Sequence, residues 1–429
     1  MQWQRLVDVD EARRILLDAV APAARRRAGS PPDMVPLAAA VGRVLARDAV
    51  AGDDVPGFAR SRVDGYAVRA RDTFGASDGA PAYLELAGEV LMGEAAGVAL
   101  PPPGGPGLPA AVAVPTGGML PAGADAVVML EHVEVAGAGG PAAGRPVIAV
   151  LRPAAPGQNV VSAGDDARRG ERVVQAGRRL RPQEVGALAG IGWVEVPVYP
   201  APEVALLSSG DEVVPPERPC GPGQVRDMNG PALAAALGRD GARVRTPGIV
   251  PDRCDDLLAA LRAAAGADLV LISGGSSVGA RDLVARAVAE LGPPGVLCHG
   301  IAIRPGKPTL IASANGVPLV GLPGHPVSAL VVYELVVRGA LRALAGEAPA
   351  AEPDRWRRAR LACDVGSVIG RDDYISVELD RRDGGAWATP VPGNSSLMTG
   401  LVRARGLVRI PARMSGAAAG DEVDVLCLD

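Results

Sequence analysis

The stretch DLVLISGGSSVGARDLVARAVAELG, residues 268–292, joins an apolar run, a glycine-rich segment and a segment of alternating apolar and charged residues. A short apolar run bounded by glycines is typical of a buried β-strand. The segment that follows repeats its apolar residues at helical spacing. Residues 268–292 are therefore predicted to form a strand, a loop and a helix.

The same alternation extends along the chain from residue 203 to residue 345. The other predicted strands read EVALLSS, ARVRTPGIV, GVLCHGIAI, PTLIAS and VPLVGL, and the other predicted helices read PALAAALGRDG, DDLLAALRAAAGA and PVSALVVYELVVRGALRALAG. Strands that alternate with helices in this way favour a doubly wound parallel sheet. We assign this α/β domain to residues 182–345.

The rest of the chain predicts further domains, so the fold class is multidomain α/β. Residues 8–21 and 33–48 have helical character near the N-terminus. Short apolar runs broken by Gly/Pro clusters follow, and short strands with glycine turns return after residue 356. We expect an N-terminal linker and helical domain (1–53 with 156–181), a β-rich inserted domain (54–155) and a small C-terminal β domain (346–429).

Charge and composition exclude several classes of partner. The formal net charge is -4, and the only basic run is Arg25 to Arg27, whereas general nucleic-acid binders cluster many cations. Asp8, Asp10 and Glu11 interrupt the region where a signal peptide has its apolar core. No stretch of 18 apolar residues occurs. We expect a cytoplasmic protein that binds neither nucleic acid nor membrane.

The cysteines and histidines argue against a zinc site or a disulfide framework. The five cysteines are an odd number, are widely spaced and form no C-x-x-C motif. Only three histidines are present. Reduced thiols are therefore expected.

Four loops leave the carboxyl ends of the predicted strands, where doubly wound sheets bind their ligands. They are SSGDEV (208–213), SGGSSVGARD (273–282), AIRPGKP (302–308) and GLPGHPVS (321–328). In the second loop Gly274, Gly275 and Gly279 allow backbone N–H groups to approach an anion. Ala280 and Arg281 stand where a Walker A motif needs Lys-Ser/Thr, which excludes an ordinary P-loop triphosphatase. A purely structural glycine turn is an equal alternative for this loop alone.

Lys307 is the only lysine among 44 basic residues. Lysine is a compact point charge, whereas arginine is a planar fork, and the two differ most at crowded oxyanion sites. Pro305 and Pro308 on either side restrict the loop, and a second fork beside Arg304 is expected not to fit. A chance survivor of compositional bias is the alternative explanation.

Cations and carboxylates are predicted to share this sheet edge. Arg304 and Lys307 supply the positive charge, and Asp211, Asp227 and Asp282 supply the negative charge. Such a mixture suits a phosphate ester bound with Mg²⁺, because this ion takes one or two carboxylates together with phosphate oxygens. Helix capping is a serious alternative for Asp282, which precedes a predicted helix.

Taken with other segments, these loops resemble the molybdopterin molybdenumtransferases of the bacterial MoeA type, which are related to the E domain of gephyrin. The resemblance covers nearly the whole chain. It is carried by DVPGFARSRVDGYAV (54–68), PTGGMLPAGADAVVMLE (115–131), GQNVVSAGDDARRG (157–170), RPQEVGALAGIG (181–192), LSSGDEV (207–213), RDMNG (226–230), ISGGSSVGARD (272–282), AIRPGKP (302–308) and GLPGHPVSAL (321–330).

The resemblance implies a homodimeric enzyme of molybdenum cofactor biosynthesis with a shared active site. Its substrates would be molybdate and adenylylated molybdopterin, AMP would be released, and Mg²⁺ would assist. A molybdopterin adenylyltransferase and proteins of molybdoenzyme maturation are the partners that it suggests.

The resemblance also implies roles for individual residues. The implied catalytic set is Asp64, Thr116, Asp166, Glu184, Asp227, Asp282 and Lys307, with Asp227 and Asp282 as metal ligands. The implied cofactor-binding set is Gly274, Gly275, Ser276, Gly279, Arg304, Gly306, Lys307, Pro323, Gly324 and Pro326. Asp64, Thr116, Asp166 and Glu184 rest on the resemblance alone, because nothing else in the sequence distinguishes them from ordinary polar residues.

Several positions depart from the usual pattern of this family: Val63, Pro115, Arg304 and His325, the last standing where asparagine is usual. The glycine-rich loop also lacks the usual valine at position 276 and an acidic or aromatic residue near position 280. Three alternatives therefore stay open. One is a catalytically weak paralogue that binds the cofactor or acts as a scaffold, and another is a variant that uses tungstate. The third is an adenylyltransferase, which would resemble residues 203–340 alone.

Overall fold

The strand, loop and helix predicted at 268–292 are present in the computed structural model as β17 (Leu269–Gly274) and α5 (Val278–Leu291). The structure describes residues 6–105, 107–138, 145–274, 278–348, 355–382 and 384–428. The chain divides into two compact units. Unit 1 comprises Met1–Arg47, Ala176–Val185 and Glu195–Asp429, and unit 2 comprises Asp48–Gln175 and Gly186–Val194.

Unit 1 is built on a six-stranded sheet with the strand order β16-β13-β17-β21-β20-β18. The strands are β13 (Glu203–Ser209), β16 (Arg243–Val250), β17, β18 (Pro294–His299), β20 (Leu310–Ala314) and β21 (Val317–Leu322). Successive residues of β13 point to opposite faces, so Val204 and Leu206 join one core while Ala205 and Leu207 join another.

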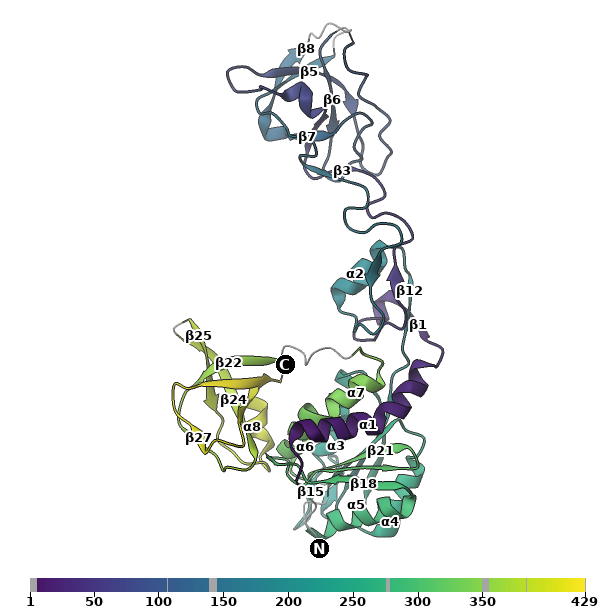
Figure 1. Cartoon of the computed structure of the whole chain (residues 1–429), viewed down its shortest axis with the longest axis vertical. Helices are drawn as coiled ribbons and strands as arrows, with labels where there is room; N and C mark the ends of the chain where they lie inside the picture. The colour runs from purple at the N-terminus through teal and green to yellow at the C-terminus, as the bar shows by residue number, and fades with distance from the viewer. Residues whose placement is uncertain are drawn as a thin grey trace. The chain divides into compact units, whose positions relative to one another are not determined.

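Helices cover both faces of this sheet, as a doubly wound fold requires (Figure 1). The first core contains residues of α1 (Val9–Ala28), α3 (Asn229–Arg239), α6 (Pro326–Val332), the π-helix η4 (Tyr333–Val337) and α7 (Arg338–Leu344). The second core contains residues of α4 (Cys254–Ala263) and α5. The predicted helix at 8–21 is therefore correct but longer, and Asp8 caps it by accepting a 2.8 Å hydrogen bond from the Glu11 amide.

The prediction of an all-parallel sheet is wrong for one strand. β20 runs antiparallel to both β18 and β21. Asn315 and Gly316 connect β20 to β21 with φ values of 49° and 80°. Two consecutive residues with positive φ form the tight turn that joins antiparallel strands, so the sheet is mixed.

The helical character predicted for residues 33–48 is also wrong. Residues Asp33–Pro36 form strand β1, which pairs with β12 (Glu195–Val198), and only a 3-10 turn at Leu37–Ala39 follows. Proline restricts the residue before it to extended conformations. Pro36 therefore holds Val35 in the strand and stops a helix from starting earlier.

The C-terminal part of unit 1 is a closed β-barrel. Its strands are β22 (Trp356–Leu361), β24 (Asp372–Arg382), β25 (Gly385–Pro390), β26 (Gly406–Ile410) and β28 (Glu422–Cys427), with α8 at Met398–Arg403. The order is β24-β25-β22-β28-β26, and pairing of β26 with β24 closes the sheet. A short strand from the sheet domain, β19 (Ile303–Arg304), adds to β24.

Unit 2 contains a six-stranded sheet of its own, with the order β7-β4-β6-β5-β9-β8. Its strands are β4 (Gly65–Val68), β5 (Ala82–Glu89), β6 (Ala110–Val114), β7 (Ala126–Met129), β8 (Val133–Ala138) and β9 (Pro146–Val150). Two strand pairs flank it: β3 (Arg60–Ser61) with β10 (Val160–Val161), and β2 (Ala49–Val50) with β11 (Arg172–Val174). The division of the chain into four domains stays a prediction.

Candidate functional site

The carboxyl ends of β13, β17, β18 and β21 lie at one edge of the unit 1 sheet, because these strands are mutually parallel through the pairings of the sheet. The four loops selected from the sequence leave this edge. The edge is therefore where the candidate residues of unit 1 are to be sought.

The glycine-rich loop begins at a position that accepts only glycine. Gly274 has φ of 152°, and a Cβ there would lie 2.2 Å from the carbonyl oxygen of Ser209. The backbone of β17 is thus pressed against β13 where the loop starts. Gly275 and Ser276 lie outside the described residues. Gly279 and Asp282 belong to the first turns of α5, where the structure describes the backbone alone.

Asp227 is held in a fixed orientation at the start of α3. Its Oδ2 accepts a 2.6 Å hydrogen bond from the Ser208 hydroxyl, and its Oδ1 accepts a 2.8 Å bond from the Gly230 amide. A Cβ at Gly230 would lie 2.5 Å from Oδ2. Helix capping accounts for the bond to Gly230, and each oxygen keeps a further lone pair.

Asn229, which the sequence did not single out, connects two of the loops with the start of α3. Its Nδ2 donates to Ser273 Oγ at 2.7 Å and to the Gly324 carbonyl oxygen at 2.8 Å. The start of α3, the end of β17 and the loop after β21 are therefore tied together. An Asn two residues after an Asp in RDMNG was the only available signal.

A pair of acidic side chains lies beyond β13. The Asp252 amide donates to Asp211 Oδ1 at 3.2 Å. Burial raises the pKa of Asp252, and the charges of Asp211 and Glu212 act in the same direction. Across the described ranges, no three His, Cys, Asp or Glu side chains gather closely enough to hold a metal ion.

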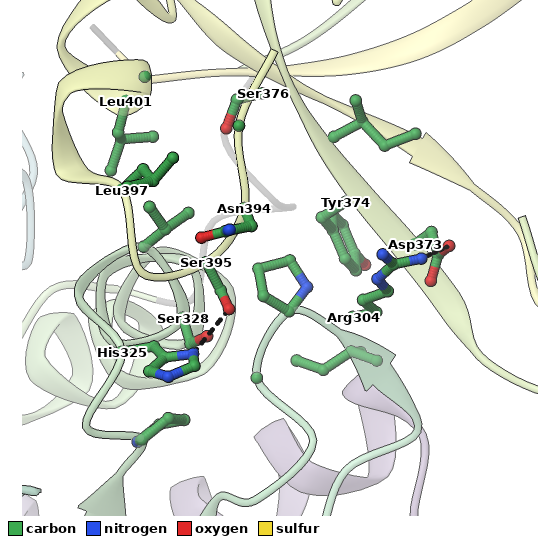
Figure 2. A pocket seen from close by; sticks show the side chains of 18 of the residues that line it. Arg304, His325, Ser328, Asp373, Tyr374, Ser376, Asn394, Ser395, Leu397 and Leu401 are labelled. Atoms are coloured by element: carbon green, nitrogen blue, oxygen red, sulfur yellow. Dashed lines mark hydrogen bonds and ion pairs between the residues drawn. The ribbon is translucent and has the colours of Figure 1, made fainter. Parts of the chain in front are cut away.

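A cavity of about 580 Å³ opens between the loops 303–308 and 323–328 and the C-terminal barrel. Figure 2 shows Arg304, Asp373 and Tyr374 on one side of it and His325, Ser395 and Ser328 on the other. The residues predicted to bind cofactor that line it are Arg304, Gly306, Lys307, Pro323 and Gly324. The barrel supplies Arg371, Asp373, Tyr374, Ser376, Asn394 and Ser395.

The charge of this cavity favours an anion. Among the described residues that line it, Arg304, Lys307 and Arg371 are cationic and Asp373 is the carboxylate. The side chain of Asp373 is only 4% exposed, and its oxygens lie 3.1 Å from Arg371 Nε and 3.8 Å from Arg304 Nη1. One carboxylate shared between two guanidiniums leaves the cavity with net positive charge.

The loop that carries Lys307 is tightly shaped. A Cβ at Gly306 would lie 2.7 Å from both Ile303 Cδ1 and Val332 Cγ2, and φ is +118°. The Thr309 hydroxyl donates to the Gly306 carbonyl at 2.7 Å. The packing at Gly306 and the hydrogen bond from Thr309 therefore fix the backbone position from which the exposed Lys307 side chain extends. Pro326 is buried in the first turn of α6 and does not line the cavity.

His325 is in contact with the barrel across the cavity. Its Nδ1 lies 2.8 Å from Ser395 Oγ, and the backbone amide of Val327 donates to the Ser395 carbonyl at 3.1 Å. The barrel residues Arg371, Asp373 and Ser395 were missed by the sequence reasoning. They lie far along the chain from the loops that they face, and only the charged run RDD at 371–373 gave any signal.

In unit 2 the structure brings together two residues that the family resemblance singled out. The Thr116 amide donates to Asp64 Oδ1 at 2.7 Å, and both residues are exposed. No side chain fits at Gly65, next to Asp64, because a Cβ there would lie 2.0 Å from the Val128 carbonyl oxygen. Asp166 is exposed in the loop after β10, where its backbone amide donates to the Val55 carbonyl oxygen at 3.0 Å.

Glu184 is held by two arginines near the start of α2 (Pro182–Gly190). Its carboxylate accepts from Arg181 Nη2 at 2.6 Å, from the Arg181 amide at 3.0 Å and from Arg178 Nη2 at 3.1 Å. Hydrogen bonding to Arg181, with a smaller part from Arg178, lowers the pKa of Glu184 to about 2. These contacts amount to a helix cap reinforced by ion pairs.

Three family models match consecutive parts of the chain. They are the MoeA N-terminal region (domain I and II) at residues 7–192, the probable molybdopterin binding domain at residues 205–343 and the MoeA C-terminal region (domain IV) at residues 358–428. Together they span nearly all of the sequence.

Individual proteins give the same result. The molybdopterin molybdenumtransferase 2 of Mycobacterium tuberculosis is 34% identical over 402 residues, which cover 92% of this chain and 94% of that protein. The molybdopterin molybdenumtransferase of Synechococcus elongatus is 32% identical, with coverage of 92% and 94%. A crystal structure of a molybdopterin biosynthesis MoeA protein from Pyrococcus horikoshii OT3 superposes with a TM-score of 0.78 at 31% identity, covering 99% of this chain and 100% of that one.

Proposed function

The chain belongs to the MoeA family of molybdopterin molybdenumtransferases, and from that membership we propose that it inserts molybdate into adenylylated molybdopterin with release of AMP. Its place in molybdenum cofactor biosynthesis follows from the family. The adenylylated substrate, Mg²⁺ and the residue roles described below are parts of the proposal.

The observation that carries the proposal is the cationic cavity between the sheet domain and the barrel. Molybdate is a tetrahedral dianion. Among the described residues that line a space of about 580 Å³, Arg304, Lys307 and Arg371 carry positive charge, and the carboxylate of Asp373 is shared between the two arginines. Two guanidiniums and one ammonium offer both forked and single donors to its oxygens. We assign molybdate binding to this cavity.

The phosphate part of the substrate is assigned to the neighbouring loops of the same edge. Gly274 and the start of α5 offer backbone N–H groups to a phosphate. Asp227 fits a Mg²⁺ ligand, since Ser208 and Gly230 orient its carboxylate and leave lone pairs on both oxygens. Asp282 would be the second ligand, and the ion would neutralise phosphate charge. Asn229 ties this region to the molybdate cavity through Gly324.

The residues of unit 2 enter through a homodimer with shared sites. Asp64 and Thr116 form one hydrogen-bonded corner there, and Asp166 is exposed in the same unit, so all three are accessible to a second chain. We assign the catalytic contribution of this unit to them. Glu184 contributes through Arg178 and Arg181, which its carboxylate orients.

The location and the partners are also proposed. A cytoplasmic enzyme would receive its substrate from a molybdopterin adenylyltransferase and pass the cofactor to proteins of molybdoenzyme maturation. In the part of the chain that the structure describes, no helix has the length and apolar character needed to cross a membrane.

Reconstitution tests the proposal. The purified protein is incubated with adenylylated molybdopterin, MgCl₂ and either molybdate or tungstate, and AMP release and metal-loaded cofactor are measured. We expect release of AMP that depends on molybdate. Release with tungstate alone would identify a tungstate enzyme, and tight binding of the pterin without any AMP release would identify a binding or scaffold protein.

A further inference from the structure

The anion cavity has walls from two different parts of unit 1. The loops 303–308 and 323–328 come from the sheet domain, and residues 371–376 and 391–401 come from the barrel. Its width therefore depends on the contacts that hold the barrel against the sheet domain.

On one side of the cavity, backbone pairing sets this distance. Ile303 pairs with Asp372 and Arg304 with Asp373 in the parallel β19–β24 ladder. The Asp372 amide donates to the Ala302 carbonyl at 2.9 Å. This side does not depend on any single side chain.

On the opposite side of the cavity, one barrel residue makes two hydrogen bonds to the sheet domain. Ser395 accepts a hydrogen bond at its carbonyl from the Val327 amide, and its hydroxyl contacts His325 Nδ1 at 2.8 Å (Figure 2). Its neighbours from Pro392 to Leu397 are exposed, so little buried apolar surface holds this loop in place. Ser395 therefore ties this loop to the sheet domain by two hydrogen bonds, beside the packing of Leu401, at the end of the same barrel segment, against the core of the sheet domain.

The His325 end of this contact is rigid. The preceding Gly324 carbonyl accepts from Asn229, and the His325 carbonyl accepts from Ala329 at 3.0 Å in the first turn of α6. The barrel loop is thus bound to a part of the sheet domain whose backbone is held by hydrogen bonds. A serine hydroxyl can donate to the ring nitrogen or accept from it, so the contact is a hydrogen bond in either tautomer of the ring.

We propose that His325 is a positioning residue for anion binding: its contact with Ser395, here called the clasp, holds the barrel loop 391–397 in place and so sets the width of the molybdate cavity. This inference rests on the proposed function of the cavity. The clasp itself depends only on the two hydrogen bonds at Ser395.

A double-mutant cycle tests the clasp. His325→Ala, Ser395→Ala and the double variant are titrated with sodium molybdate by calorimetry, and exchange of the Val327 amide is followed by mass spectrometry. We expect each single variant to bind molybdate about five- to tenfold more weakly, the effect of losing one ordinary hydrogen bond. The double variant should be no weaker than either single one, because both remove the same contact. Val327 exchange should become faster in all three.

Two further variants make the test specific. His325→Asn keeps a polar atom near the Nδ1 position and should recover most of the affinity and of the Val327 protection. Ser396→Ala removes a hydroxyl of the same loop that donates to Asn394 Oδ1 within the loop itself, and it should leave both measurements unchanged. In turnover, His325→Ala should raise the KM for molybdate and leave kcat at saturation nearly unchanged.

The contrary results are clear. Additive losses in the double variant, or unchanged Val327 exchange in His325→Ala, would overturn the clasp. If the wild-type protein binds no molybdate, the assignment of the anion to this cavity fails, and the exchange measurement still decides whether His325 holds the loop.

Discussion

Gly306 shows how a single missing side chain shapes the anion cavity. Its φ of +118° and the two methyl-bearing side chains 2.7 Å from a Cβ position leave room for glycine alone. Arg304 and Lys307 lie on either side of it. A change at Gly306 must therefore move the two cations that the loop presents.

Gly306→Ala is expected to destabilise the fold by about 2–4 kcal/mol, through backbone strain together with the clash. Gly316→Ala is the matched control, because Gly316 also has positive φ, at +80°, but nothing lies within 4 Å of its Cβ position. The control should lose only about 1 kcal/mol. Urea unfolding of both variants measures the difference, and equal losses would show that the clash is relieved at no cost.

Lys307 is expected to act as a point charge. Lys307→Ala should lose most turnover, and Lys307→Arg should fail to restore it although the charge is kept, because the guanidinium is a planar fork and the loop is shaped by Gly306 and two prolines. Rates of AMP release decide this. An Arg variant with full activity would mean that the lone lysine is a compositional accident.

The sequence could identify only the half of the cavity that follows the strands of the sheet. Arg304 and Lys307 are recognisable because loops at the carboxyl edge of a doubly wound sheet meet one another. Arg371, Asp373 and Ser395 are not, since nothing in a local pattern says which barrel loop docks against which sheet loop. Tertiary contacts between distant segments decide that, and they have no periodic signature.

At the scale of elements, the two wrong predictions, the direction of strand β20 and the helix at residues 33–48, have local causes. The strand pattern at 310–322 was recognised, but its direction depended on the Asn315–Gly316 turn, which was overlooked. Residues 33–48 have apolar spacing that suits a helix, but Pro36 and the partner strand β12 favour an extended chain. Buried strands and long helices were predictable because their periodicity is strong.

The α2 helix provides a prediction on pH. The pKa of Glu184 is lowered to about 2 by Arg181 and Arg178. Its ion pairs therefore contribute stability fully above pH about 4.5, the ordinary value for Glu, and lose it as the pH falls toward 2. Glu184→Gln should lower the urea midpoint at pH 7, and the difference from wild type should shrink below pH about 4.5.

Glu195→Gln is the control for this measurement, because Glu195 is an exposed carboxylate at the start of β12. Glu195→Gln should leave the urea midpoint unchanged both at pH 7 and below pH about 4.5. A Glu184→Gln deficit that stays constant down to pH about 2 would contradict the ion-pair explanation.

At the scale of the whole molecule, the candidate residues are distributed over two units. Arg304, Lys307 and Asp227 belong to unit 1, whereas Asp64, Thr116 and Asp166 belong to unit 2. The proposed homodimer would let residues of one chain complete the site of another. Sequence patterns within one chain carry no information on such an assembly beyond the family resemblance.

Mixed dimers test the shared site. Asp64→Ala and Lys307→Ala chains are unfolded and refolded together in equal amounts, which should give about half heterodimers. In each heterodimer one site would collect both lesions and the other none, so activity should return to roughly a quarter of wild type. A heterodimer shown to be present but inactive would exclude a site shared in this way.

The burial of α1 has a consequence for the order in which a growing chain can fold. Its Val9, Leu16 and Val20 pack into the core that α7 completes, and Arg27 bonds to the Leu344 carbonyl at 3.0 Å. Helix α1 must therefore wait for residues synthesised more than three hundred positions after it. Two apolar clusters of unit 2, by contrast, are built from residues between 63 and 160. Because domains fold as units during translation, we expect unit 2 to resist protease on nascent chains stalled near residue 250, while α1 is still cut.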